Sequence, residues 1–195
     1  MFYLVLIGVV AIIAIAVAYV LSQSQLPATS NSGELPPLER NVFTLQIGDI
    51  VQYLGSDWVV EGQLTYNEDG FTWLEYMLQD SDRIAWLSVE EDDGLEVQWL
   101  EPTNALEVGS NPPKELTFEG EVFRCVSSGV ALMKRTGTIQ RRRSEECHYY
   151  DYEGAGDRVL SIEDWDGEIE VTIGQNIRPS SLSLLPGTGS SVYRS

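Results

Sequence analysis

The sequence predicts an all-β fold made of two related antiparallel five-stranded halves, packed as a sandwich or barrel and preceded by one N-terminal transmembrane helix. Three observations predict this fold: an apolar run at the start of the chain, a two-residue alternation of apolar and polar side chains after residue 40, and an internal repeat. Alternation with a period of two residues is typical of strands with one buried face, whereas helices repeat every 3.6 residues.

The apolar run is FYLVLIGVVAIIAIAVAYVL, residues 2–21, and it carries no charge. A helix rises about 1.5 Å per residue, so a segment of this length crosses a hydrocarbon core of about 30 Å. A cleaved signal peptide is the alternative, but its apolar region is usually about 7–15 residues long and follows positive charges. We therefore expect residues 1–22 to anchor a single-pass protein in a plasma or internal bacterial membrane, through residues 2–21.

The composition after the anchor divides the chain further. Residues 23–41 are rich in Ser, Pro, Asn and Gln, and residues 186–195 are rich in Gly and Ser. Both segments are therefore expected to be flexible, the first as a linker and the second as a tail. Between them we expect a first β module at 42–104 and a second β module at 105–185.

The segment FTWLEYML, residues 71–78, illustrates the strand pattern. One face of the predicted strand carries Leu74, Tyr76 and Leu78, and the other carries Phe71, Trp73, Glu75 and Met77. Asp-Gly pairs at 69–70, 93–94 and 166–167 predict two-residue hairpin turns, because both central residues of such turns take positive φ. The pairs Gly55-Ser56 and Ser128-Gly129 predict further turns.

The internal repeat joins LSVEEDDG, residues 87–94, to LSIEDWDG, residues 160–167, without a gap at an offset of 73 residues. Tyr76 and Tyr149 are separated by the same offset. Chance similarity between two acidic hairpins is the alternative, but a gapless match within a similar rhythm of strands and turns favours duplication. Because a small isolated sheet is only marginally stable, we expect the two halves to pack together.

Several segments also resemble a known family. They are GDIVQYLGSDWVVEGQL, WLEYML and WLSVEEDDG, followed later by YYDYEGAGDRVLSIEDWDGEIEVTIGQNI. Through them the chain resembles the bacterial domain-of-unknown-function family 4178 over about residues 43–185. The resemblance implies a tandem β module without a known reaction, and a genetic context of polyamine synthesis and small membrane proteins. This context favours the cytoplasmic side of the membrane for the β domain.

The chain is acidic, with 12 Lys and Arg residues against 30 Asp and Glu residues and a formal net charge of −18. Nucleic-acid binding needs basic surface that displaces counterions, so no nucleic-acid partner is expected. The 2 Cys residues are too few for a disulfide framework or an all-cysteine zinc site. We expect Cys125 and Cys147 to be buried thiols, and a disulfide between them is the alternative in an oxidising compartment.

Two acidic runs follow the repeat: Glu90, Glu91, Asp92 and Asp93 in the first copy, and Glu163, Asp164 and Asp166 in the second. Their spacing matches no EF-hand loop, and neighbouring strand residues point to opposite faces, so the carboxylates cannot all converge on one ion. We interpret both runs as solvated hairpin tips, and we expect no metal and no cofactor.

The segment KRTGTIQRRR concentrates basic residues that are rare elsewhere in the chain: Lys134, Arg135, Arg141, Arg142 and Arg143. Such a surface would bind anionic lipid headgroups, with about 1 kcal/mol per charge, or an acidic protein partner. The alternative is an exposed edge hairpin whose charges prevent aggregation between strands.

A candidate ligand site lies on the strand at 71–78. Glu75 shares one face of this strand with Phe71 and Trp73, opposite the predicted core stripe. A carboxylate flanked by aromatic rings can bind an organic cation through charge and cation–π attraction. The alternative is a second packed face in which Glu75 pairs with an arginine.

These observations favour a binding protein over an enzyme. His148 is the only histidine, and its neighbour Cys147 projects from the opposite face of a strand, so the two cannot form a nucleophile–base pair. The sequence predicts a non-catalytic membrane-tethered module that acts on a membrane protein complex or a lipid surface. The alternative is a β domain that binds a small cation or a polyamine-type ligand.

Overall fold

The computed structural model describes residues 39–139, 145–187 and 189–193. The predicted anchor and nearly all of the predicted linker lie outside the described residues. In the part of the chain that the structure describes, no helix is both long and apolar enough to cross a membrane.

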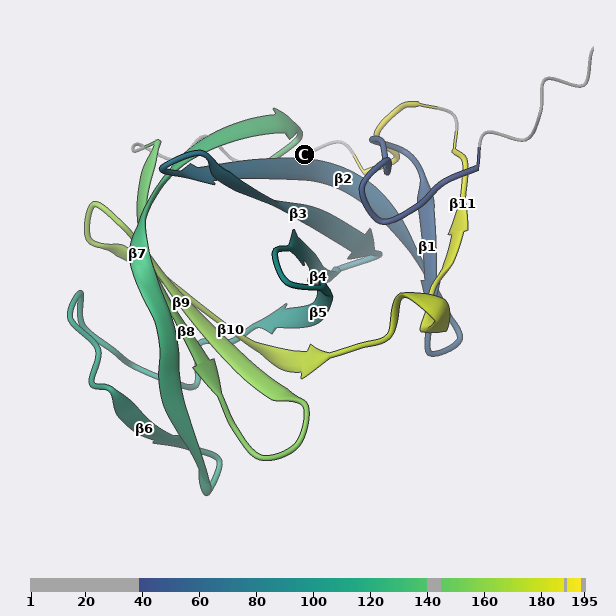
Figure 1. Ribbon diagram of the computed structural model, residues 1–195. Helices are drawn as coiled ribbons and strands as arrows, with labels where there is room; N and C mark the ends of the chain where they lie inside the picture. Colours follow the sequence, from purple (N-terminus) through teal and green to yellow (C-terminus); the bar gives the residue numbers. More distant parts are fainter. Residues whose placement is uncertain (1–38, 140–144, 188, 194–195) are drawn as a thin grey trace, which may run out of the picture. The chain divides into compact units, whose positions relative to one another are not determined.

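The described chain is all-β apart from one 3₁₀ turn at Pro179–Ser181, which confirms the all-β part of the predicted fold (Figure 1). Eleven strands form one sheet: β1 (Ile50–Tyr53), β2 (Ser56–Glu68), β3 (Phe71–Asp80), β4 (Arg83–Glu91), β5 (Leu95–Pro102), β6 (Glu115–Phe118), β7 (Glu121–Gly137), β8 (Glu146–Glu153), β9 (Arg158–Trp165), β10 (Glu168–Asn176) and β11 (Ser183–Leu185).

Eight of these strands close into an antiparallel barrel. Two meanders, β2–β5 and β7–β10, are joined at one side by the pairing of β5 with β10. The barrel closes at the other side, where β2 pairs with β7. Of the two packings that the sequence left open, a sandwich or a barrel, the structure therefore adopts the barrel.

β2 and β7 are long enough for each to pair with an additional strand of the sheet. The first part of β2 pairs with β1 and the first part of β7 pairs with β6, whereas their later parts pair with each other to close the barrel. Gly62 lies opposite Gly137 in this closing pair. A Cβ at Gly137 would collide with the carbonyl oxygen of Glu61, so the close approach of the two strands depends on glycine.

The turns follow the sequence in part. Asp69-Gly70 and Asp166-Gly167 have positive φ at both residues, as predicted for two-residue hairpins. The Asp93-Gly94 pair lies instead in a longer loop between β4 and β5, and neither residue has positive φ. The prediction of a turn at Ser128-Gly129 is wrong, because both residues lie within β7 and pair with β8.

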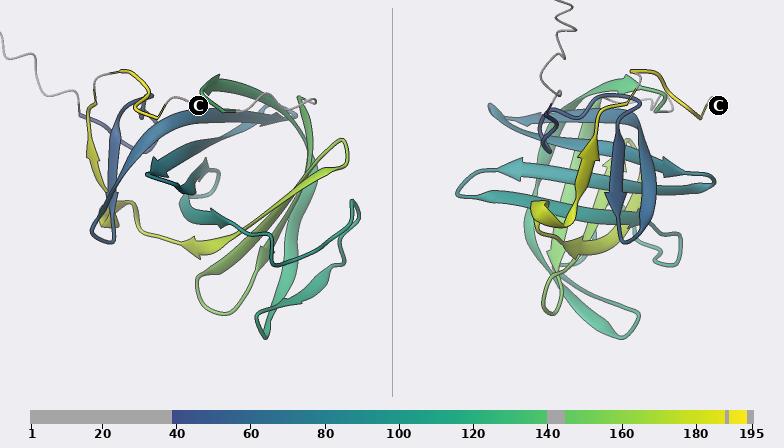
Figure 2. Two further views of the ribbon diagram at one scale, coloured as in Figure 1. Left: turned by 180° about the vertical axis from the view of Figure 1, so that it is seen from behind. Right: turned by 90° about the vertical axis from the view of Figure 1, so that its right-hand side faces the viewer.

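Two apolar cores cover the outer faces of the barrel wall. The first lies against β3–β5, under β1, the beginning of β2 and β11, and includes Tyr76, Leu87 and Trp99. Figure 2 shows β1 and β11 crossing in front of these strands. The second lies against β8–β10, under β6 and the connection from β5, and includes Phe123 and Tyr152.

The register corrects one detail of the predicted repeat. Tyr76 lies opposite Leu87, and the residue opposite Leu160 is Tyr152. Tyr149 lies opposite Glu163 instead. The counterpart of Tyr76 in register is therefore Tyr152, and the shared offset of Tyr76 and Tyr149 does not reflect an equivalent position.

The C-terminal segment is held by two buried carboxylates. The backbone N–H of Gly187 donates to Asp49 Oδ1 over 2.8 Å, and Asp49 is also paired with Arg40. Glu61, at the bulge in β2, accepts hydrogen bonds from the N–H groups of Val192 and Tyr193 over 2.8 and 3.0 Å. The described part of the predicted tail is thus ordered against β2.

Both cysteines are free thiols, as the sequence predicts, but Cys125 is only partly buried and not buried as expected. Cys147 is buried inside the barrel and lies opposite Ala131, whereas Cys125 lies opposite Tyr152. The two sulfur atoms are therefore separated by several residues along adjacent strands, beyond the reach of a disulfide.

Candidate functional site

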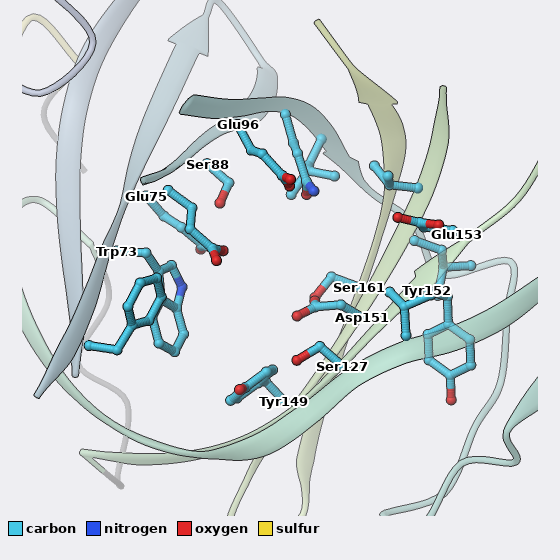
Figure 3. Close-up of a pocket in the computed structure, with 17 residues that line it drawn as sticks. Trp73, Glu75, Ser88, Glu96, Ser127, Tyr149, Asp151, Tyr152, Glu153 and Ser161 are labelled. Atoms are coloured by element: carbon cyan, nitrogen blue, oxygen red, sulfur yellow. The ribbon is translucent and has the colours of Figure 1, made fainter. Parts of the chain in front are cut away.

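The interior of the barrel has an apolar part and an acidic part. The apolar part is a buried cluster that includes Leu64, Trp86, Met133 and Trp165. Beside it lies a pocket with a cavity volume of about 170 Å³. Side chains from both meanders line this pocket and face one another across it (Figure 3).

The lining of the pocket contains five carboxylates and, among the described residues, neither Lys nor Arg. The carboxylates are Glu75 on β3, Glu90 on β4, Glu96 on β5, and Asp151 and Glu153 on β8. The remaining polar lining consists of Ser88, Gln98, Ser127 and Ser161. The pocket is therefore strongly electronegative.

Aromatic rings form one side of the pocket. Phe71, Trp73 and Tyr149 line it, and the rings of Trp73 and Tyr149 meet edge to face at 5.4 Å between centroids. On its other side Trp73 stacks on Tyr66, with the ring centroids 4.9 Å apart and the planes inclined by 3°. Aromatic faces beside carboxylates are the usual surroundings of a bound organic cation.

Asp151 is the carboxylate most affected by its surroundings. Burial raises its pKa from 3.8 to about 7, while the hydrogen bond from Ser161 Oγ to Asp151 Oδ1, 2.7 Å long, lowers it and the charges of Glu163 and Glu90 raise it. Burial, with the charges of Glu96 and Asp92, also raises the pKa of Glu90. Both groups are therefore short of positive partners in the described structure.

A second, much smaller pocket adjoins the first. Its cavity volume is about 10 Å³, and its lining includes Glu163, Glu170 and Glu75. The hydroxyl of Tyr66 donates to Glu163 Oε1 over 2.5 Å and lies 3.3 Å from Glu75 Oε2. Trp165 Nε1 donates to Glu163 Oε2 over 3.2 Å. Tyr66 and Trp165 thus supply hydrogen-bond donors to Glu163 in this smaller pocket.

The structure brings together all three residues that the sequence predicts for a ligand site. Phe71, Trp73 and Glu75 project from the same face of β3 and line the larger pocket. Whether they bind a ligand stays a prediction.

The predicted basic surface is only partly described. Lys134 is exposed on β7, whereas its neighbour Arg135 is half-buried on the opposite face of the strand, opposite Leu64. Arg141, Arg142 and Arg143 lie outside the described residues. The proposed role of these five residues in binding a partner or lipid stays a prediction.

Sequence reasoning missed several lining residues. It assigned Glu90 to a solvated hairpin tip together with Glu91, but Glu90 lines the pocket while Glu91 is exposed. It gave no role to Glu96 or Asp151. The alternation of Ser88 and Glu90 with buried apolar residues does predict a polar face for this strand. It does not predict that this face lines a pocket inside a barrel.

The described residues contain no group of three or more His, Cys, Asp or Glu side chains arranged to hold a metal ion. The five carboxylates of the larger pocket are therefore spread around a cavity and do not converge on one point.

Comparison with known proteins gives the family. The family model described as Domain of unknown function (DUF4178) matches residues 46–179. This range includes both meanders. The chain belongs to the DUF4178 family. An uncharacterized protein of Mycobacterium tuberculosis (strain H37Rv) is 32% identical to this DUF4178 chain and covers 94% of it and 95% of its own length. An uncharacterized protein of Aquifex aeolicus is 25% identical and covers 77% of this chain and 85% of its own. No solved structure matches the chain.

Proposed function

We propose that this protein binds a small organic cation in the larger pocket of the barrel, without catalysing a reaction. One observation carries the proposal: five carboxylates line a cavity of about 170 Å³ that has no Lys or Arg among its described lining residues. Burial and neighbouring carboxylates raise the pKa of Asp151 and of Glu90, so a bound cation would favour the charged form of these two groups.

The form of the pocket favours an organic cation over a metal ion. A metal ion needs several oxygen ligands at about 2.0–2.6 Å from one point, and no described group of residues offers that arrangement. Trp73, Phe71 and Tyr149 add aromatic surface, which attracts a cation through the negative face of the ring and packs against its apolar part.

We also propose that the two meanders are related by duplication and that the site arose from it. The register supports this relation. Ser88 lies opposite Glu75 in the first meander, and Ser161 lies opposite Asp151 in the second. Ser88 and Ser161 occupy the same position in the repeated eight-residue segment.

The membrane-tethered accessory role expected from the sequence is a separate proposal. It depends on residues 2–21, on a cytoplasmic position of the β domain, and on a membrane-protein partner. Cation binding is compatible with that role, because a tethered domain can present a ligand site beside a membrane complex.

Calorimetric titration of the full-length protein in a mild non-ionic detergent tests cation binding. The ligands are spermidine, benzamidine and tetramethylammonium, each added as chloride salt at constant ionic strength. We expect saturable heat with at least one of them, and a melting temperature that rises with free ligand because binding stabilises only the folded state. A ligand at about 100 times its Kd adds about 2.7 kcal/mol.

Two variants locate the binding. Glu75→Gln and Glu90→Gln each remove one negative charge from the pocket lining, and we expect each to weaken binding. Glu101→Gln is the matched control, because Glu101 is an exposed residue of β5 that does not line the pocket. No heat and no thermal shift with any of the three cations would overturn the proposal, as would equal affinity loss in the control.

A further inference from the structure

Asp151 lies on β8 between two serines of the neighbouring strands. In the ladder it is opposite Ser127 on β7 and opposite Ser161 on β9. Within the described residues its carboxylate has one hydrogen bond, which Ser161 Oγ donates to Oδ1 over 2.7 Å. At the positions directly opposite Asp151, the two flanking strands therefore supply a neutral hydroxyl donor and no cation.

The charged groups that face Asp151 from the surrounding strands carry the same sign as its own carboxylate. They are Glu75 on β3, Glu90 on β4, Glu96 on β5, Glu153 on β8 and Glu163 on β9. Glu163 follows Ser161 by two residues, so it is a diagonal neighbour of Asp151 on the same face of the sheet. The neutral titratable groups nearby are Cys125 on β7 and Tyr149 and Tyr152 on β8.

The nearest described positive charge acts on Cys125 and lies outside the pocket. It belongs to Lys114, beside β6, which is not among the residues that line the cavity. Figure 3 shows the carboxylates of Asp151 and Glu75 pointing into the cavity from opposite sides. The cavity is therefore the place from which a positive partner can reach Asp151.

These surroundings divide Asp151 between two protonation states near neutral pH. Burial, opposed by the hydrogen bond from Ser161 and reinforced by the charges of Glu163 and Glu90, raises its pKa to about 7. A carboxyl group in such surroundings is neutralised either by a proton or by a cation placed beside it.

We propose that the larger pocket exchanges a proton on Asp151 for a bound organic cation. This inference rests on the proposed function and adds regulation by pH to the same site. When the cation binds, the O–H bond of the Asp151 carboxyl group breaks, the electron pair stays on the carboxylate, and the proton passes to solvent. For a singly charged cation the net charge of the pocket is the same before and after the exchange.

Glu90 and Glu163 indicate why Asp151 is the group that exchanges its proton. Tyr66 O–H and Trp165 N–H already donate to Glu163. Burial, with the charges of Glu96 and Asp92, raises the pKa of Glu90, so a bound cation favours its charged form as well and reinforces the exchange. Asp151 has a single neutral donor and is therefore a group to which a cation adds a large stabilisation.

The exchange makes affinity depend on pH in a defined direction. Above pH 7 Asp151 is charged before the cation binds, whereas below pH 7 the cation must displace a proton. With a pKa of about 7 in the free protein and a charged carboxylate in the complex, affinity should be about tenfold weaker at pH 6 than at pH 8. Acidification therefore releases the cation.

Calorimetric titration of the full-length protein in a mild non-ionic detergent counts the released protons. The probes are benzamidine, spermidine and tetramethylammonium, and the last has no proton to release itself. Each is titrated at pH 7 in PIPES and in ACES, which are not net cations and differ in their heat of protonation. We expect binding to be more exothermic in ACES, by the heat that corresponds to about half a proton per bound cation.

Three variants assign the proton. Asp151→Asn keeps the size of the side chain but has no titrating carboxyl group, so most of the buffer dependence and of the pH dependence should be lost. Ser161→Ala removes the hydrogen bond that lowers the pKa of Asp151, and the midpoint of the pH dependence should move to higher pH. Ser88→Ala is the matched control, because Ser88 lines the same pocket but lies opposite Glu75, and it should leave this midpoint unchanged.

The outcomes separate this inference from the proposed function. Equal heats in the two buffers, together with equal affinity at pH 6 and pH 8, would overturn the exchange while leaving cation binding intact. Full proton release in Asp151→Asn would also overturn it. If Asp151→Asn does not fold, the proton count of the wild-type protein and the midpoint of Ser161→Ala decide. Absence of binding by any of the three cations would overturn the proposed function itself.

Discussion

The hydroxyl of Tyr66 donates a hydrogen bond to Glu163 Oε1 over 2.5 Å, across the barrel and 97 residues along the chain. The same hydroxyl lies 3.3 Å from Glu75 Oε2, so one phenol links strands of both meanders. It lies beside the larger acidic pocket, which Glu75 also lines. The function that we propose depends on that larger pocket.

Tyr66→Phe tests the energetic importance of this contact. The substitution keeps the stacked ring but leaves Glu163 and Glu75 without the donor, and we expect it to lower the free energy of unfolding by about 1–3 kcal/mol. Urea unfolding measures the change. Tyr150→Phe is the control, because its hydroxyl donates to Ser110 O at an exposed site, and a change within about 0.5 kcal/mol is expected there. Equal losses in the two variants would contradict the assigned role of Tyr66.

Asp151 is expected to make stability depend on pH. Its pKa in the folded protein, about 7, lies above its ordinary value of 3.8, so the folded state holds a proton that the unfolded chain releases between these values. The contribution of Asp151 to stability is therefore full below pH 4 and is lost as the pH rises to 7. Asp151→Asn should reduce the loss of unfolding free energy between pH 5 and pH 8 by roughly 2 kcal/mol relative to wild type.

Urea unfolding at the two pH values measures this difference. Asp57→Asn provides a control, because Asp57 is an exposed residue outside the pocket. If the wild-type protein and Asp151→Asn lose the same stability between pH 5 and pH 8, the shifted ionisation of Asp151 is excluded.

Glu61 is predicted to hold the C-terminal segment on the barrel. Its carboxylate is fully buried and accepts hydrogen bonds from the backbone of Val192 and Tyr193 and from Ser191 Oγ. Glu61→Ala removes the acceptors and leaves these donors unpaired, so we expect a loss of roughly 2–4 kcal/mol. Hydrogen exchange at the amides of Val192 and Tyr193 should become faster. Unchanged protection of these two amides would show that other contacts hold the segment.

Gly137 is expected to be required for closure of the barrel. Its φ is +93°, and a Cβ would collide with the carbonyl oxygen of Glu61 and lie 2.9 Å from Gly62 Cα. Gly137→Ala should therefore lower stability by about 2 kcal/mol or more through strain and a widened seam. Gly70→Ala separates the two effects, because Gly70 has a similar φ of +98° but open space around it. Thermal unfolding should show a clearly larger loss for Gly137→Ala than for Gly70→Ala.

Much of the local structure could be predicted from the sequence. The alternation at 71–78 assigned Tyr76 and Leu78 to a buried face and Trp73 and Glu75 to the other, as observed. Alternation is a local property, because successive side chains of any strand point to opposite faces. The same rule made the Asp-Gly turn at 69–70 predictable, since positive φ is a preference of those two residues themselves.

The sequence by itself therefore determined the all-β class, the faces of strands such as residues 71–78, and the family. Only the tertiary structure decided that β2 pairs with β7, and that the polar faces of both meanders consequently meet inside a closed barrel. Pairing between distant strands depends on packing and chain closure over the whole domain, which no local pattern encodes. That closure brings Asp151 to the pocket lined by Glu75 and places Tyr66 beside Glu163.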